Sequence, residues 1–169
     1  IESVRKLQEA VIPQDISVPA AYTVAARYEP SQIRVVGGQP VVLAGGDYYD
    51  VVSLGDHEQV IIVGDASGHG MKACMSIMTM HTLIQMIREE RFNNTADYVV
   101  QVNERLCANE LIVEEGGFIT LLYCLLDTQT HTLEWTSAGH PMPLLHDLGT
   151  GEVRPLADDD NAGPPLGIT

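Results

Sequence analysis

Apolar runs alternate with short polar breaks along the whole chain, and their residue types indicate strands towards both ends and helices in the middle. β-branched and aromatic residues dominate the runs of the first half, which is typical of strands. These predicted strands are residues 22–28, 33–36, 41–44, 48–54 and 59–63. The Gly-Asp-His-Glu sequence at 55–58 has the composition of a tight turn, so the last two strands are expected to form an antiparallel hairpin.

Two helices are predicted in the middle of the chain. Residues 71–88 contain neither glycine nor proline and are apolar on nearly every side, which indicates a long helix buried on more than one side. Residues 96–109 form the second helix, with Asn94 or Thr95 as its cap. Its predicted apolar face consists of Tyr98, Val99, Val102 and Leu106.

The methionines of the first helix have two interpretations. We interpret them as core filling, with a pliable surface for a partner as the alternative. They are Met71, Met75, Met78, Met80 and Met86.

The last part of the chain returns to strands, and it completes a pattern that predicts the fold class. The expected strands are residues 118–126, 133–137, 143–146 and 153–156. Strands, two helices and more strands, with hairpins predominating, predict an α+β fold in which a helix pair packs on an antiparallel sheet. A short helix over residues 2–11, ended by Pro13, is either a packed N-terminal helix or a connector from an upstream domain.

Composition narrows the possible partners. A chain of 169 residues with 45% apolar residues is expected to form one domain, and its net charge of −14 argues against a nucleic-acid partner. The acidity serves either solubility or the binding of a metal ion. The cysteines Cys74, Cys107 and Cys124 have no paired spacing, which predicts reduced thiols in a cytoplasmic protein. No apolar run is long enough to predict a membrane segment, and the N-terminus has no signal-peptide layout.

Two Gly-Asp corners carry the candidate chemistry. Asp47 begins one strand of the predicted hairpin and Asp65 ends the other, so both carboxylates are expected at the same end of adjacent strands. Carboxylates beside glycine carbonyls are hard oxygen ligands suited to Mg²⁺ or Mn²⁺. Two such ions about 3.5–4 Å apart would activate a bound water for attack on a phosphoryl group. The alternative is that Asp47 and Asp65 only close turns by accepting backbone N–H groups.

The neighbouring histidines and Ser67 leave their roles open. His69 lies between glycines at a helix start, where a general acid, a phosphate contact and a simple turn residue are all compatible with the sequence. His140 is either a structural hydrogen-bonding residue at a strand end or a participant in the chemistry. Ser67 has no recognisable base and orienting group in the sequence.

Five motifs in order resemble the signature of the SpoIIE/RsbU-like bacterial branch of the PPM (type 2C) protein phosphatases. They are residues 45–50 (GGDYYD), 64–70 (GDASGHG), 118–121 (FITL), 138–141 (AGHP) and 165–167 (PLG). The resemblance implies an αββα sandwich and Mn²⁺- or Mg²⁺-dependent removal of phosphate from serine or threonine. It also implies a phosphorylated anti-sigma-factor antagonist of the STAS type as substrate, with a homodimer as a possible state.

The resemblance also implies roles for particular residues. Asp47 and Asp65 would be the catalytic pair, with Asp47 a ligand of one metal, Asp65 bridging both, and the Ala66 carbonyl completing the site. The residues that would support the site or its frame are Asp50, Gly68, His69, Thr120, Gly139 and His140. Residues 7–13 (LQEAVIP) resemble the segment that joins the family's phosphatase domain to an upstream sensor or receiver domain. This implies a connector helix over residues 1–14 and a phosphatase domain over residues 15–169.

The sequence departs from the family pattern in two places. Eukaryotic members have a histidine as proposed general acid where this chain has Ser67, so that role is not transferred to His69. The family continues beyond Pro-Leu-Gly to a Thr-Asp-Gly motif that supplies another metal ligand, whereas this sequence ends at Thr169. We therefore expect a further Asp ligand and the rest of the fold beyond that residue, and weak or single-metal occupancy by residues 1–169 alone.

Three other functions are alternatives to the phosphatase. A phosphatase-like module that only binds a partner would share the motifs without the activity. A diguanylate cyclase shares Gly-Gly-Asp, but its motif continues with Glu-Phe where this chain has Tyr48 and Tyr49. A receiver domain would need an acidic pair just after its first strand, which this sequence lacks.

Overall fold

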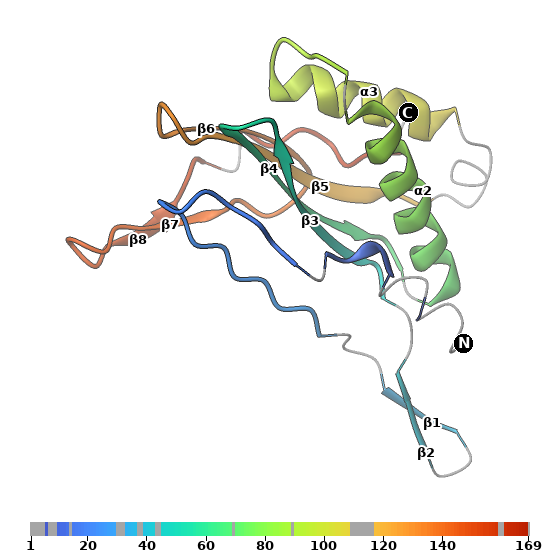
Figure 1. The fold of residues 1–169 in the computed structure, drawn as a ribbon. Helices are drawn as coiled ribbons and strands as arrows, with labels where there is room; N and C mark the ends of the chain where they lie inside the picture. The colour runs from blue at the N-terminus through green and yellow to red at the C-terminus, as the bar shows by residue number, and fades with distance from the viewer. Residues whose placement is uncertain are drawn as a thin grey trace.

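The computed structural model describes residues 6, 10–13, 15–29, 33–36, 39–42, 45–68, 70–88, 90–108, 117–158 and 161–168. The elements follow the predicted order of strands, two helices and further strands (Figure 1). They are β1 (Ile33–Val36), β2 (Gln39–Val42), β3 (Asp47–Leu54), β4 (Glu58–Ala66), α2 (Met71–Ile87), α3 (Thr95–Cys107), β5 (Ile119–Asp127), β6 (Thr132–Ala138), β7 (Leu144–His146) and β8 (Val153–Pro155). The predicted α+β class is confirmed. Of the predicted N-terminal helix, only Lys6, Ala10 and Val11 are described in helical conformation, and the rest lies outside the described residues.

The centre of the molecule is a four-stranded antiparallel sheet in the order β3-β4-β5-β6. The predicted β3–β4 hairpin is present, and Gly55 takes the positive φ of 78° in its turn, a conformation that glycine adopts without steric cost. At the β5–β6 turn, the Asp127 Oδ1 atom accepts the backbone N–H groups of Gln129 at 2.8 Å and Thr130 at 3.0 Å. Local turn chemistry therefore fixes the register of both hairpins.

One face of this sheet is covered by α2 and α3 (Figure 1). Alternate residues of β4 point to this face because successive side chains of a strand point to opposite sides. Val60, Ile62 and Ala66 are buried there with the α2 residues Ile77 and Met80. Burial of each large aliphatic side chain contributes about 1.5–3 kcal/mol, so this interface is the main source of stability.

Helix α3 follows its sequence signals closely. The Asn94 side chain accepts the backbone N–H of Asp97 at 2.8 Å, which identifies Asn94 as the cap. Thr95, the alternative cap, is buried and donates its backbone N–H to Glu134 of β6 at 2.7 Å. All members of the predicted apolar face are buried, namely Tyr98, Val99, Val102 and Leu106.

The interpretation of the α2 methionines as core filling is wrong for most of the set. Met80 is fully buried, but Met71, Met75 and Met86 expose 58%, 52% and 68% of their surface. Only one side of α2 is covered, by the sheet and by α3, and its buried positions are Ala73, Cys74, Ile77, Met80, Ile84 and Ile87. The prediction of burial on more than one side is wrong for the same reason.

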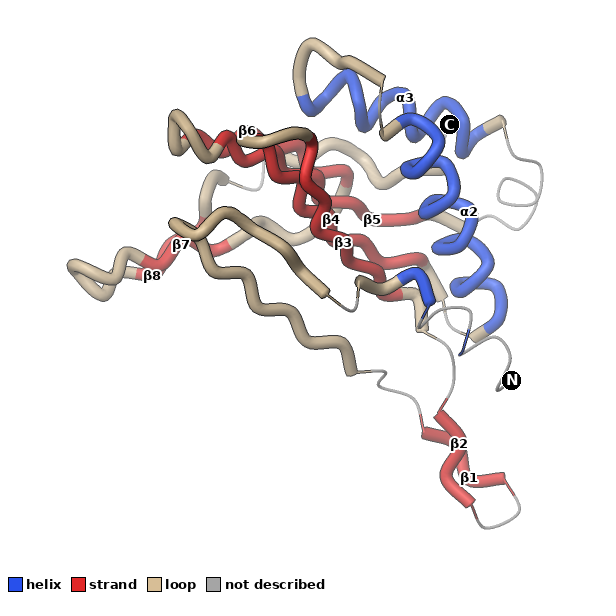
Figure 2. Tube along the Cα trace, in the orientation of Figure 1, coloured by secondary structure: helices blue, strands red, loops and turns tan. Residues whose placement is uncertain are grey.

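The predicted strand at 22–28 is also wrong. These residues are extended but do not belong to a sheet, and they run as a loop (Figure 2). The Tyr22 backbone N–H donates to the Pro19 carbonyl at 2.9 Å, and the Tyr22 hydroxyl hydrogen-bonds the His131 Nδ1 atom at the β5–β6 turn. The segment is therefore held to the central sheet by side chains and local bonds rather than by a strand ladder.

Candidate active site

Asp47 and Asp65 lie directly opposite each other at one end of the β3–β4 ladder. Asp47 is the first residue of β3 and Asp65 is the last but one of β4, and both are exposed. Both point to the face of the sheet away from the helices, because Tyr48, Gly64 and Ala66 occupy the other face. Like charges directly opposite on neighbouring strands repel. Partial burial, and after it the Asp47 carboxylate, raise the pKa of Asp65, while nearby His140 acts in the opposite direction. The pair thus forms a concentrated negative charge that a bound cation would relieve.

The close approach of Gly46 brings further oxygen atoms to this pair. A Cβ atom at Gly46 would lie 2.5 Å from the Ala66 carbonyl oxygen and 2.9 Å from the Asp65 Oδ1 atom. The Gly46 carbonyl also accepts the Ala66 backbone N–H at 2.9 Å, which fixes the two corners against each other. Only glycine fits here, and its absent side chain leaves the carboxylate and the carbonyl converging on one point.

Thr120 and His140 extend the site across β5. Thr120 is paired with Asp65 in the ladder, and its hydroxyl donates to the Asp65 carbonyl at 3.4 Å. The same hydroxyl lies 2.9 Å from the His140 Nδ1 atom. Burial lowers the pKa of His140, and the Asp65 and Asp47 carboxylates act in the opposite direction. The imidazole is therefore held in place through Nδ1 beside the acidic pair.

Gly139 determines where His140 sits. It has a φ of 65°, and a Cβ there would meet Pro165 side-chain atoms at 2.6 and 2.8 Å. Its backbone N–H donates to the Gly163 carbonyl at 2.7 Å, while the buried Ser137 hydroxyl donates to the His140 carbonyl at 2.8 Å. The two motifs around residues 139 and 165 thus pack against each other to present the imidazole.

Asp50 lies apart from the acidic pair, in a buried network between β3 and α2. Its carboxylate accepts the Tyr48 hydroxyl at 3.1 Å, the Val51 backbone N–H at 2.9 Å and the Gln85 amide at 3.4 Å. The Tyr48 hydroxyl also lies 2.9 Å from the His81 Nδ1 atom. Burial, and after it Asp50, raise the pKa of Tyr48 well above its usual range. Asp50 therefore anchors α2 to the strand that carries Asp47.

The loop after β4 contains the remaining candidates. Gly68 has a φ of 88°, and His69 lies outside the described residues. The Ser67 hydroxyl accepts the Phe118 backbone N–H at 2.9 Å, and its own backbone N–H donates to the Phe118 carbonyl at 2.8 Å. Ser67 thus ties the end of β4 to the start of β5, a structural role that the sequence did not indicate.

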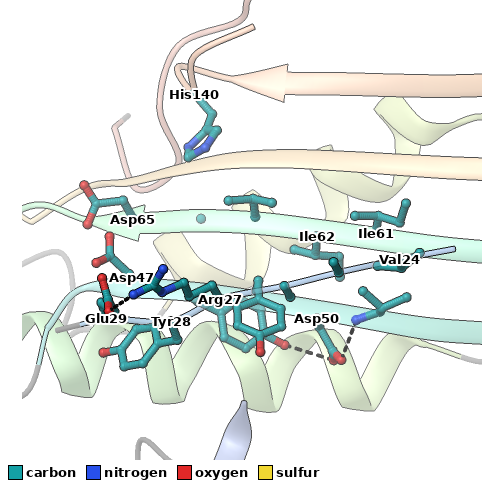
Figure 3. Close-up of a pocket in the computed structure, with 17 residues that line it drawn as sticks. Val24, Arg27, Tyr28, Glu29, Asp47, Asp50, Ile61, Ile62, Asp65 and His140 are labelled. Carbon is teal, nitrogen blue, oxygen red and sulfur yellow. Dashed lines mark hydrogen bonds and ion pairs between the residues drawn. The ribbon is translucent and has the colours of Figure 1, made fainter. Parts of the chain in front are cut away.

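A cavity of about 670 Å³ opens beside the acidic pair (Figure 3). Its floor is the open face of β3 and β4, and its other walls are His140 and the extended segment at 24–29. Arg27, Tyr28 and Glu29 therefore belong to the site, although sequence reasoning missed them. No local pattern marks them, because they reach the cavity only through the path of the segment at 22–28, which the sequence predicts as a strand.

The donor set at this end of the sheet fits a hard divalent cation. The Asp47 and Asp65 carboxylates and the Ala66 carbonyl provide oxygen atoms only, which is the chemistry preferred by Mg²⁺ and Mn²⁺. Within the described residues, no three Asp, Glu, His or Cys side chains gather closely enough to hold a metal ion. The acidic pair and a backbone carbonyl are thus the oxygen donors that this part of the chain offers.

The antiparallel sheet with a helix pair on one face and Gly-Asp corners at its end is a fold that the chain shares with solved structures, among them a PP2C phosphatase domain. It overlaps the PP2C phosphatase domain of SpoIIE from Bacillus subtilis with a TM-score of 0.55 at 18% identity, over 81% of this chain and 37% of that one. It overlaps the RsbU and RsbW domains of Rv1364c from Mycobacterium tuberculosis with a TM-score of 0.61 at 28% identity, over 73% of this chain and 32% of that one.

Residues 55–169 match the family model of stage II sporulation protein E (SpoIIE), and the chain belongs to this family. It is 24% identical to protein IcfG of Synechocystis over 88% of the chain and 26% of IcfG. It is 27% identical to the phosphoserine phosphatase RsbP of Bacillus subtilis over 60% of the chain and 25% of RsbP. The chain thus spans about a quarter of the length of these curated relatives.

None of the described helices combines the length and the apolar character needed to cross a membrane.

Proposed function

We propose that this domain is a metal-dependent phosphatase that removes phosphate from phosphoserine or phosphothreonine of a regulatory protein. The observation that carries the proposal is the register of Asp47 against Asp65, beside the Ala66 carbonyl and at the mouth of a cavity. Similarity to a phosphoserine phosphatase, RsbP, favours this reaction class. The phosphatase domain would comprise residues 15–169 together with any further part of the fold.

In this mechanism the chain's own residues bind and orient. Asp47 and Asp65 would hold Mn²⁺ or Mg²⁺, with Asp65 shared between two ions and the Ala66 carbonyl as a further ligand. When bound, the metal would supply charge neutralisation for the phosphoryl group and lower the pKa of a water molecule. Thr120 holds the Nδ1 side of His140, so the imidazole keeps a fixed position beside Asp65. The open cavity would admit a phosphorylated side chain.

The substrate is proposed from the relatives. One similar structure carries an RsbU domain together with an RsbW domain in one chain, which favours a role in a regulatory cascade with a protein substrate. We therefore propose a phosphorylated STAS-type regulatory protein as substrate, and an upstream sensor or receiver domain as the source of control.

The test is a phosphatase assay of the purified full-length protein with p-nitrophenyl phosphate and a phosphoserine peptide. We expect hydrolysis with Mn²⁺ or Mg²⁺, none with EDTA, and about a thousandfold less in Asp65→Asn than in the wild-type protein. Asp56→Asn is the matched control, because Asp56 lies in the turn at the other end of the same hairpin and is exposed. Absence of metal-dependent hydrolysis in the wild-type protein would instead support a phosphatase-like module that only binds a partner.

A further inference from the structure

The cavity beside the acidic pair is lined by several carboxylates and by a single strong cation. Among its described lining residues, Arg27 is the only lysine or arginine, whereas Glu29, Asp47, Asp50 and Asp65 are acidic. A phosphomonoester carries up to two negative charges, and these carboxylates repel it. Any metal at Asp47 and Asp65 offsets part of this repulsion, but Glu29 still adds a negative charge to the lining. Arg27 is therefore the one fixed positive group that the described lining offers to the substrate.

Arg27 is positioned to reach an incoming phosphate. It comes from the extended segment that forms one wall, and its guanidinium points toward the end of the cavity where Asp47 and Asp65 lie (Figure 3). The segment is held in place at the far side by the hydrogen bond between the Tyr22 hydroxyl and His131. Near the site, the Tyr28 hydroxyl would lie 3.4 Å from a Cβ at Gly45, so the segment also approaches the first Gly-Asp corner.

The present partner of Arg27 is easily exchanged. Its Nη2 atom forms an ion pair with Glu29, and the two side chains are 81% and 70% exposed. Exposed ion pairs of this kind contribute only about 0–1 kcal/mol. A phosphate can accept two hydrogen bonds from the planar guanidinium of Arg27, as a carboxylate can, and it carries more negative charge than a carboxylate. Exchange of Glu29 for a substrate phosphate is therefore favourable on charge and geometry.

We propose that Arg27 binds the phosphate of the substrate, and that Glu29 holds the guanidinium until the substrate displaces it. This inference rests on the proposed phosphatase function, and it adds the residue that recognises the phosphomonoester. Glu29 then acts as an internal competitor that weakens substrate binding. The alternative is that the exposed ion pair between Arg27 and Glu29 only orders the extended segment. In that case substrate affinity depends on neither residue.

The kinetic test uses p-nitrophenyl phosphate with the full-length protein in Mn²⁺. We expect Arg27→Ala to raise KM by about tenfold or more and to change kcat by less than about threefold, because a charge-assisted pair to phosphate is lost. The KM of Arg27→Lys is expected to lie between those of the wild-type protein and Arg27→Ala. Lysine keeps the positive charge but lacks the two parallel N–H donors of the guanidinium. Glu29→Gln is expected to lower KM by about twofold to fivefold, since the competitor is removed.

Arg91→Ala is the matched control. Arg91 is 91% exposed and forms a comparable surface ion pair with Glu58 at 3.6 Å, but it does not line this cavity. Its KM is expected to equal that of the wild-type protein. A KM for Arg27→Ala within twofold of the wild-type value, or an equal rise in Arg91→Ala, would overturn the proposal.

A binding measurement separates this inference from the proposed function. Inorganic phosphate is titrated calorimetrically into the wild-type protein and Arg27→Ala in the presence of Mn²⁺. If the wild-type protein hydrolyses nothing, the phosphatase proposal fails, but a Kd for phosphate raised about tenfold in Arg27→Ala still supports Arg27 as the phosphate-binding residue. Equal affinities in the two proteins, or no binding to either, contradict the role of Arg27 whatever the activity.

Discussion

The two faces of the central sheet obey different rules although the same strands form both. On the helix face, Val60, Ile62 and Ala66 are almost fully buried, and the buried carboxylate of β3, Asp50, accepts hydrogen bonds from Tyr48 and the Val51 N–H. On the other face, at the same strand ends, Asp47 and Asp65 stand opposite each other, exposed and with like charge. Burial on the helix face stabilises the fold, whereas repulsion between Asp47 and Asp65 destabilises it at one end of the other face.

This difference teaches where function lies in the fold. Folding alone gives no reason to place two carboxylates opposite each other, with Gly46 in a position where no side chain fits. Unfavourable local arrangements persist where a ligand or a reaction uses them. The two faces therefore predict opposite responses to substitution: changes on the helix face should lower stability, and changes at the acidic pair should lower activity.

The largest effect is expected at Asp65. Asp65→Asn should reduce metal-dependent hydrolysis by about a thousandfold, the equivalent of about 4 kcal/mol of transition-state stabilisation, because a metal ligand is lost. Its unfolding midpoint in urea with EDTA should not fall below that of the wild-type protein. A variant that is inactive only because it is unfolded would refute the separation of the two faces.

Met80 tests the helix face. Met80→Ala should lower the free energy of unfolding by about 2–5 kcal/mol, because a fully buried side chain is removed from the interface of α2 with the sheet. Met75→Ala, on the exposed side of the same helix, should change it by less than about 0.5 kcal/mol. Urea unfolding of both variants measures this, and equal losses would show that α2 buries a second side.

Asp50 tests whether the face of the sheet determines the role of a carboxylate, because it lies on the same strand as Asp47 but faces the helices. Asp50→Asn should cost about 1–3 kcal/mol of unfolding free energy, since Tyr48, Gln85 and the Val51 N–H lose a charged acceptor. The apparent affinity for Mn²⁺ in the assay should stay within about threefold of the wild-type value in the protein that remains folded. Loss of Mn²⁺ affinity at unchanged stability would place Asp50 with the acidic pair instead.

The smallest effect is expected when the repulsion between Asp47 and Asp65 is removed. In EDTA at neutral pH, Asp47→Asn should raise the free energy of unfolding by about 0.2–1 kcal/mol, because Asp65 no longer faces a like charge. Asp56→Asn should leave it unchanged. Chemical denaturation measures the difference, and a lower stability for Asp47→Asn would mean that its carboxylate has a structural role in the turn.

The acidic pair and the sheet that carries it could be predicted from the sequence, because their signals are local. Two apolar, β-branched runs with a turn at Gly55 between them predict the hairpin, and the hairpin places Asp47 opposite Asp65. The cap at Asn94 and the apolar face of α3 are local in the same sense.

The predictions were wrong where the conformation or burial of a segment depends on contacts with residues far away in the sequence. Residues 22–28 have strand composition, but a strand also needs a partner ladder, and their path follows side-chain contacts such as Tyr22 with His131. The exposed methionines of α2 depend on how much of that helix the sheet covers. Arg27 could not be recognised because its place in the cavity follows from the path of the misassigned segment.

The most direct test of the central claim is the thermal unfolding of the full-length protein titrated with Mn²⁺. A ligand at about a hundred times its Kd stabilises the folded state by about 2.7 kcal/mol, which predicts a rise in Tm of about 5–10 °C for the wild-type protein and Asp56→Asn. Asp47→Asn and Asp65→Asn should show little or no rise. An equal rise in Asp65→Asn would contradict the account, because the metal would then bind without the residue that is proposed to hold it.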